Sequence, residues 1–110
     1  MARRSVISAL SAAWRPVEVE GYSMLPTFVP GEKLWARRLW RTPRVGEVVV
    51  ARDPQRPGQW IIKRVAQVSA AGIELRGDNS EASTDSRDFG LVERRDVLYV
   101  VPGSRRTVKE

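Results

Sequence analysis

Few side chains in this sequence could do covalent chemistry. It contains no histidine and no cysteine, which excludes a Ser–His–Asp triad, a thiol nucleophile and zinc sites built on imidazole or thiolate. A nucleophile must therefore be a serine or a threonine. Lysine is the remaining side chain that can act as a base near neutral pH, once it is desolvated.

Ser23 is a candidate nucleophile. It lies in the segment Gly21–Thr27, GYSMLPT, where a predicted strand runs into a glycine and Pro26 prevents regular continuation. Such a corner exposes a serine hydroxyl on a fixed backbone, and its amide groups could stabilise an oxyanion. Taken alone, however, a serine between glycine and proline is more typical of an ordinary turn.

Lys63 is the candidate base. In the segment Trp60–Val65, WIIKRV, alternate residues of a strand share a face, so Lys63 points the same way as Ile61 and Val65. Apolar neighbours on that face would desolvate the amine and favour its neutral form. The alternative is an edge-strand lysine whose amine reaches water, and the segment alone favours that alternative.

A third polar segment follows, with Gly77-Asp78-Asn79 and then STDSRDFG over residues 83–90. Its side chains are rich in hydrogen-bonding groups, and Asp85 and Arg87 could pair across the loop. Alone, the segment is typical of solvated turns. The ligand number and spacing of a calcium loop are missing, so we expect neither a metal nor a cofactor.

The elements that must position these residues are predicted to be mainly strands. Alternation and short apolar runs between turn residues predict strands at Val17–Glu20, Lys33–Arg37, Glu47–Arg52, Trp60–Val68, Ile73–Arg76 and Val97–Val101. Val6, Leu10 and Trp14 recur at four-residue spacing, which predicts a short N-terminal helix or arm ended by Pro16. We therefore expect an arm over residues 1–16, one mainly β domain over 17–103 and a basic tail over 104–110.

Length and charge narrow the remaining classes. The 110 residues suffice for one domain, and the net charge is +6. A basic balance suits nucleic acid, an anionic membrane surface or an acidic partner, but the arginines are scattered rather than striped, so we expect no nucleic-acid partner. The longest apolar stretch, Ser5–Trp14, is too short for the roughly 20 residues of a spanning helix and is a poor signal peptide. We expect a soluble, cytoplasmic protein with peripheral membrane contact left open.

Read in chain order, these segments resemble the signal peptidase I family, within the larger group that includes the LexA-type self-cleaving repressors. The resemblance covers about Val17 to Val101. The matching segments are Gly21–Thr27, Pro30–Glu32, Gly46–Val50, Ile62–Val65, Gly77–Asn79 and Ser83–Gly90. An ordered set of this kind is far more specific than any one of its segments.

The resemblance implies a compact, strongly twisted β-sheet domain with a groove running past Ser23 and Lys63. It implies that Ser23 is the nucleophile, that its backbone N–H contributes to the oxyanion hole, and that Lys63 is the general base. Ser83 would orient the lysine amine, and Asp85 and Arg87 would form an ion pair that supports the site. The implied reaction is removal of an N-terminal leader or signal peptide from a precursor protein, laid along a strand edge, through an acyl-enzyme.

Some positions depart from the family pattern. Gly21 stands where some members carry a second serine, and Glu32 and Glu47 stand where aspartate is usual. We expect neither a membrane anchor nor the large inserted β-domain, because only Arg64–Arg76 separates the lysine segment from Gly77. This minimal form resembles the soluble maturation proteases that trim the leader of nickel-type superoxide dismutase.

Two alternatives stay open. One is a conventional signal peptidase acting at a membrane surface, with Trp35, Leu39 and Trp40 touching lipid rather than packing in the core. The other is a catalytically silent module that binds peptides in the same groove. A LexA-type repressor is less expected, because 22 residues before Ser23 are too few for a DNA-binding domain and a self-cleavage segment.

Overall fold

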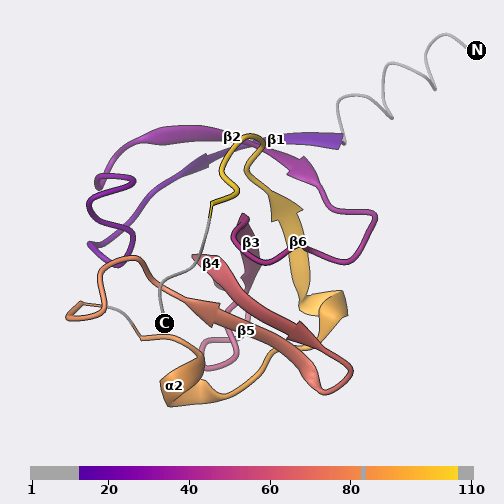
Figure 1. The fold of residues 1–110 in the computed structure, drawn as a ribbon. Helices are drawn as coiled ribbons and strands as arrows, with labels where there is room; N and C mark the ends of the chain where they lie inside the picture. Colours follow the sequence, from indigo (N-terminus) through magenta and orange to yellow (C-terminus); the bar gives the residue numbers. More distant parts are fainter. Residues whose placement is uncertain (1–12, 83, 107–110) are drawn as a thin grey trace, which may run out of the picture.

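The computed structural model of the protein describes residues 13–82 and 84–106 (Figure 1). The predicted mainly β class is confirmed. The strands are β1 (Trp14–Glu18), β2 (Lys33–Arg38), β3 (Val48–Arg52), β4 (Trp60–Ser69), β5 (Gly72–Arg76) and β6 (Val97–Val100). A one-turn helix α2 (Ser86–Phe89) and a 3₁₀ turn η1 (Arg94–Asp96) precede β6. Most of the predicted arm, residues 1–12, lies outside the described residues.

All six of these strands form one antiparallel sheet in the order β1-β2-β6-β3-β4-β5. The last strand of the chain, β6, therefore lies in the middle of the sheet and joins the pair β1–β2 to the group β3–β4–β5. The sheet is strongly curled. Although β1 and β4 are not neighbours in the sheet, the guanidinium of Arg15 in β1 lies 4.6 Å from the ring centre of Trp60 in β4. Figure 1 shows the β1–β2 ribbon passing above β4 and β5.

The N-terminal boundary of β1 differs from the prediction. The strand begins at Trp14, three residues before the predicted Val17, and Pro16 lies inside it opposite Trp35. A proline lacks the N–H that a central strand needs, but β1 is an edge strand, where such a residue is accommodated. Trp14 therefore pairs with Arg37 as part of the sheet and does not continue the predicted helix.

Clusters of buried hydrophobic residues support the sheet and the loop that carries Ser23. One cluster packs between β3, β4, β5 and β6 and includes the fully buried Val65 and Leu75. A second cluster contains Met24, which is fully buried against Val48 and Val101. Burying such a side chain stabilises a fold by roughly 1.5–3 kcal/mol. Because Met24 directly follows Ser23, this packing fixes the candidate nucleophile loop to the sheet.

The start of the predicted basic tail belongs to the fold. The Arg64 guanidinium donates to the carbonyl oxygen of Ser104 at 2.8 Å, and the N–H of Arg106 donates to the carbonyl of Gly46 at 3.0 Å. Gly46 has a φ of +94°, and a Cβ there would lie 1.9 Å from the Arg106 carbonyl oxygen. Only glycine permits this approach. Residues 107–110 lie outside the described residues.

Candidate functional site

Ser23 lies in the connection between β1 and β2, in the loop over residues 19–32. Two backbone hydrogen bonds close the base of this loop, from Val19 N–H to the Glu32 carbonyl at 2.9 Å and from Gly31 N–H to the Val19 carbonyl at 2.8 Å. Gly21 has a φ of +71°, in the left-handed region that favours glycine. The turn that follows leaves Ser23 half-buried. The predicted corner is therefore present.

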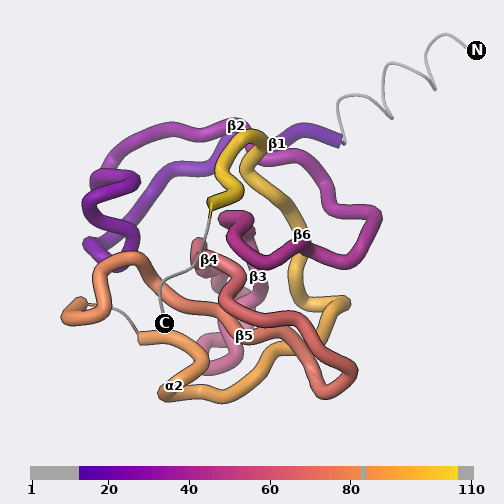
Figure 2. Tube along the Cα trace, in the orientation of Figure 1, coloured from indigo at the N-terminus to yellow at the C-terminus, as the bar shows by residue number. Residues whose placement is uncertain are grey.

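A second loop, residues 77–82, holds the Ser23 backbone in place. The Asn79 N–H donates to the Ser23 carbonyl at 2.8 Å, and the Asn79 side-chain amide donates to the Tyr22 carbonyl at 3.1 Å. Figure 2 shows this orange loop beside the purple loop that carries Ser23. The position of the candidate nucleophile thus depends on a segment more than 50 residues further along the chain.

Asp78 connects the Ser23 loop to strand β4. Its carboxylate accepts two hydrogen bonds from the buried Arg64 guanidinium, both at 2.8 Å, and one from the Thr27 hydroxyl. Burial alone would raise the pKa of Asp78, but the hydrogen bonds from Arg64 and Thr27 outweigh it and hold this pKa below its usual range. The charged pair is therefore kept intact beside Lys63.

No catalytic or supporting role was predicted from the sequence for Arg64, Thr27 or Asp78. The sequence did contain a sign of such a role, since Arg64 lies two positions after the apolar Ile62 and therefore shares its face of the strand. An arginine on a buried face needs a carboxylate partner. The sequence does not show which carboxylate that is, because Asp78 lies 14 positions from Arg64, in a loop whose path the sequence does not specify.

Lys63 lies on β4 and only 5% of it is exposed. It shares its strand face with Ile61 and Val65, as the alternation predicted, and both of these pack in the larger core cluster. Burial lowers the pKa of the Lys63 amine, and the Asp85, Asp53 and Asp88 carboxylates oppose part of that shift. More of this amine is neutral at a given pH than in an ordinary lysine. Lys63 does lie at an edge position, just before β4 begins to pair with β5, but with only 5% of the residue exposed its amine does not reach bulk water, which the alternative required.

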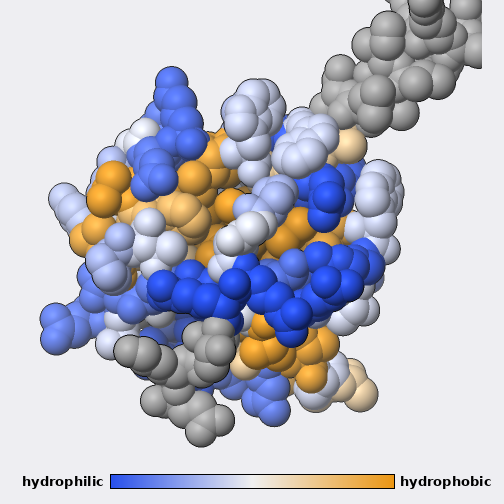
Figure 3. All heavy atoms as spheres, turned by 45° about the horizontal axis from the view of Figure 1, so that its top comes forward, coloured by the Kyte–Doolittle hydropathy of each residue, from blue (hydrophilic) through white to orange (hydrophobic). Residues whose placement is uncertain are grey.

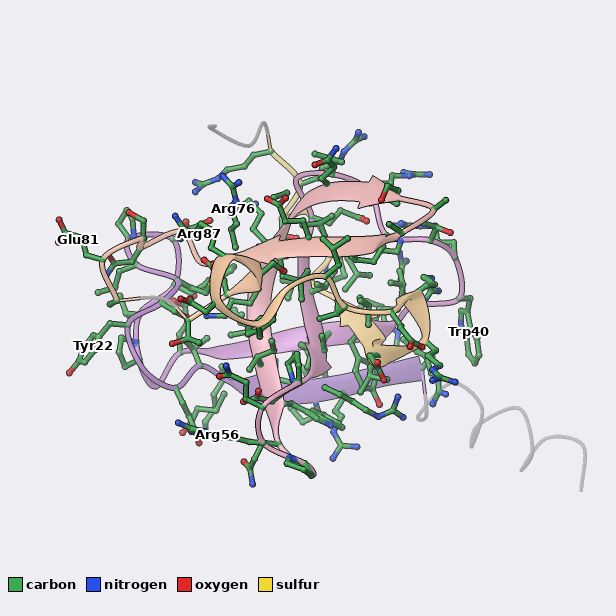
Figure 4. All side chains as sticks on the ribbon, turned by 90° about the horizontal axis from the view of Figure 1, so that it is seen from below. Tyr22, Trp40, Arg56, Arg76, Glu81 and Arg87 are labelled. Carbon is green, nitrogen blue, oxygen red and sulfur yellow. The ribbon has the colours of Figure 1, made fainter. Side chains whose placement is uncertain are left out.

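Ser23 and Lys63 line the same groove, which has a volume of about 860 Å³. One wall is the edge strand β1, and the other is the first part of β4, which pairs with β5 only from Arg64 onward. Groove-lining residues on these walls include Arg15, Val17, Glu18, Trp60, Ile61 and Ile62. Strand edges facing a groove can pair with an extended peptide. Figure 4 shows that Tyr22, beside Ser23, lies at the opposite end of the molecule from Trp40.

Asp85 and Arg87 form an ion pair, with Nη2 of Arg87 2.7 Å from Oδ2 of Asp85. They pair within one turn of helix and not across an extended loop. Asp85 is the N-cap of α2, accepts a hydrogen bond from the Arg87 N–H at 3.1 Å, and forms a capping box with Asp88. This capping explains why a predicted loop contains a helical turn.

The Asp85 carboxyl is fully buried. Burial would raise its pKa, but hydrogen bonds from Arg87 and from the Gly77 N–H outweigh that effect and lower the pKa to about 2. The resulting negative charge acts on Lys63 and opposes the effect of burial on its pKa. Ser83 lies outside the described residues, so its predicted role in orienting Lys63 stays a prediction.

Residues 13–82 and 84–106 contain no cluster of acidic residues that could hold a metal ion. No helix in the same ranges has the length and apolar character needed to cross a membrane.

The sequence matches a known family of proteins. Residues 1–78, more than half of the chain, match the family described as signal peptidase, peptidase S26. The chain belongs to this family.

Two curated relatives come from Arabidopsis thaliana. The chain is 33% identical to mitochondrial ATP-independent inner membrane protease subunit 1b over 98 residues, which is 66% of this chain and 58% of the relative. It is 32% identical to subunit 1a over 115 aligned residues, 76% of this chain and 68% of that relative. The chain thus spans about six-tenths of the length of the first of these relatives. No solved structure gives a significant match.

Proposed function

We propose that this chain is a serine endopeptidase in which Ser23 is the nucleophile and Lys63 is the general base. The observation that carries the proposal is the location of Lys63, a buried lysine with a lowered pKa in the same groove as Ser23. Membership of the signal peptidase family supports it. A base must be neutral to accept a proton, and burial is what makes a lysine neutral near physiological pH.

In the proposed reaction, the neutral Nζ of Lys63 takes the proton of the Ser23 hydroxyl as Oγ attacks the scissile carbonyl carbon. The backbone N–H of Ser23 donates to the resulting oxyanion. The C–N bond then breaks, and the Lys63 ammonium gives its proton to the leaving amine, which leaves an ester on Ser23. Lys63 next deprotonates a water molecule that attacks the ester, and the proton returns to Ser23 Oγ as the acid is released.

The supporting residues have positioning roles in this proposal. The Ser83 hydroxyl orients the Lys63 amine, as the resemblance implies. The Asp85–Arg87 pair stabilises the start of α2, whose last residue, Phe89, lines the groove. Asp78 and Asn79 hold the Ser23 loop against β4. Preorganisation of this kind is a large part of catalysis, because a small misplacement of reacting groups costs a large factor in rate.

The proposed substrate is a precursor protein with an N-terminal leader or signal peptide. Its extended segment would lie between the edges of β1 and β4, where main-chain hydrogen bonds give affinity. A leader-trimming maturation protease, such as one acting on a nickel-type superoxide dismutase precursor, is the narrower form of the proposal. The two relatives are named as proteases of a mitochondrial inner membrane, which supports peptide-bond cleavage more broadly.

Mass spectrometry of candidate precursors incubated with the purified chain tests this function. The set includes a nickel-type superoxide dismutase precursor and a precursor with a conventional signal peptide. Ser23→Ala and Lys63→Met should abolish cleavage, while Ser69→Ala and Lys33→Met, outside the groove, should not. Cleavage by Ser23→Ala would refute the assigned nucleophile. Tight peptide binding without cleavage by wild type would favour the silent binding module.

Action at a membrane surface is a second candidate, favoured by two exposed tryptophans. Trp40 is 77% exposed with the Arg38 guanidinium 5.1 Å from its ring centre, and Trp35 is 63% exposed. Leu39, which we had grouped with them, is instead buried in the core. On the face seen in Figure 3, hydrophobic patches lie on both sides of a hydrophilic band. Contact with a membrane surface would combine the aromatic rings of Trp35 and Trp40 with the cationic side chain of Arg38.

Sedimentation with vesicles tests this second candidate. Binding to vesicles with anionic lipid, lost in Trp35→Ala/Trp40→Ala and reduced by salt, would support it. Equal recovery of wild type and double variant in the supernatant would refute it.

A further inference from the structure

The segment Ser104–Arg106 contacts the sheet at several points that lead toward the proposed catalytic residues. The Ser104 hydroxyl accepts a hydrogen bond from the Val48 N–H at 2.9 Å, at the start of β3. The Ser104 carbonyl accepts from Arg64 at 2.8 Å, and the Arg106 N–H donates to Gly46 at 3.0 Å. The close approach that Gly46 permits fixes the path of the Arg106 backbone.

The Arg106 side chain extends these contacts to Asp78. Its Nη2 lies 2.8 Å from Oδ2 of Asp78, the same oxygen that accepts from the Thr27 hydroxyl and from Nη2 of Arg64. Asp78 is almost fully buried, while about half of the Arg106 side chain is exposed. Arg106 is therefore the third residue that donates to this carboxylate, and it does so from the surface, while Arg64 and Thr27 join the Ser23 loop to β4.

Both members of the proposed catalytic pair are reached from this carboxylate. Asn79, the next residue, donates its backbone N–H to the Ser23 carbonyl. Arg64, the partner of Asp78, directly follows Lys63 on β4. The Asp78 carboxylate is thus connected both to the Ser23 loop and to the strand that carries Lys63.

We propose that Ser104 and Arg106 form a C-terminal clamp, and that Arg106 is a positioning residue for the reaction of Ser23 with Lys63. This inference rests on the proposed function. Arg106 is not among the groove-lining residues, so in this proposal it acts through Asp78 and not by binding substrate in the groove. The clamp acts on the relative placement of the two reacting groups. It should therefore affect the chemical step and neither substrate binding nor the proton affinity of Lys63.

The test compares Arg106→Gln, Arg106→Lys and Arg95→Gln in the full chain. Arg95 is an exposed arginine paired with Glu93, so its variant removes the same charge elsewhere. We expect kcat for precursor cleavage to fall about tenfold in Arg106→Gln, with KM within about twofold of wild type. Arg106→Lys should recover most of the rate, and Arg95→Gln should match wild type. The apparent pKa of the rate–pH profile should stay the same in all variants.

Hydrogen exchange of the Asn79 amide provides a measurement that needs no activity. This amide donates to the Ser23 carbonyl, so it should exchange about tenfold faster in Arg106→Gln than in Arg95→Gln at a temperature where both are folded. If wild type cleaves no precursor, the proposed function fails, and this exchange rate alone decides the clamp. Wild-type kcat together with wild-type exchange in Arg106→Gln would overturn the inference. A lower melting temperature with unchanged kcat would also overturn it.

Discussion

Replacing Asp85 by asparagine should change how the stability of this domain depends on pH. In the wild type the pKa of Asp85 is lowered to about 2, from an ordinary 3.8, chiefly because the hydrogen bonds of Arg87 and Gly77 outweigh the effect of burial. A carboxyl group with a depressed pKa stabilises the folded state above its unfolded pKa. That contribution is lost as the pH falls through the folded pKa.

The size of this contribution follows from the shift. One pKa unit corresponds to ~1.4 kcal/mol, so Asp85 contributes about 2 kcal/mol to the free energy of unfolding above pH 5. The contribution should decline below pH 4 and be absent below about pH 2. An asparagine side chain does not titrate, so the stability difference between wild type and Asp85→Asn should be level just above pH 5, before Lys63, on which the Asp85 charge acts, begins to titrate. It should shrink by about 2 kcal/mol between pH 5 and pH 1.5.

Urea unfolding followed by tryptophan fluorescence, at matched ionic strength and half-unit pH steps, measures this difference. Other carboxylates titrate in the same range, but their effects cancel when the two proteins are compared at each pH. Asp88→Asn serves as a control, because it keeps the Asp85–Arg87 ion pair. If the difference between wild type and Asp85→Asn is the same at pH 5 and pH 2, the Asp85–Arg87 pair does not hold the carboxylate as argued.

Three other expectations concern the groove and its support. Lys63→Met should be more stable than wild type at pH values below the lowered pKa of Lys63, acidic pH included, because burial penalises the charged amine, and thermal melts should show this gain shrinking as the pH rises from that pKa toward 10.5. Thr27→Val, which leaves Asp78 without its hydroxyl donor, should lower the free energy of unfolding by about 1–3 kcal/mol in urea, and Thr27→Ser should restore it. Trp60→Ala, which removes the surface under Arg15 at one end of the groove, should raise KM for precursor cleavage about tenfold, and it should also lower the melting temperature, because the Trp60 ring packs against the Tyr99 ring. An unchanged KM would show that substrate does not reach Trp60.

Much of the fold could be predicted from the sequence, because strand alternation is a local signal. β4 was predicted as Trp60–Val68 and is Trp60–Ser69, since this run is rich in β-branched residues and is bounded by turn residues at both ends. The start of β1 was missed because Pro16 usually ends a regular element, and only the position of β1 at the sheet edge makes it acceptable. The turn α2 could have been found from Asp85 and Asp88, three residues apart, which form its capping box.

The site was less accessible to sequence reasoning. Ser23 and Lys63 were chosen from ordered short segments and from the absence of histidine. Alternation predicted which strand face carries Lys63, but the segment alone favoured an amine that reaches water, and only the assembled sheet shows that Lys63 is buried. The connections between segments could not be predicted in this way. The Arg106–Asp78 contact spans 28 positions and involves residues that look like ordinary surface charges in the sequence. Such pairs are set by how the strands assemble and not by any local pattern.

The central position of β6 has a consequence for how this protein is made. The segment carrying Ser23 belongs to the β1–β2 side of the sheet, and Lys63 belongs to the β3–β4–β5 side. In the sheet, only β6 pairs with a strand from each side, at Arg37 and at Val49 among others. Strand pairing between the two sides therefore waits until Val97–Val100 have been synthesised. We expect a chain that lacks these residues to connect the Ser23 segment to the β3–β4–β5 side only through loop and side-chain contacts, such as the Asn79–Ser23 hydrogen bond, and so to hold the groove less firmly.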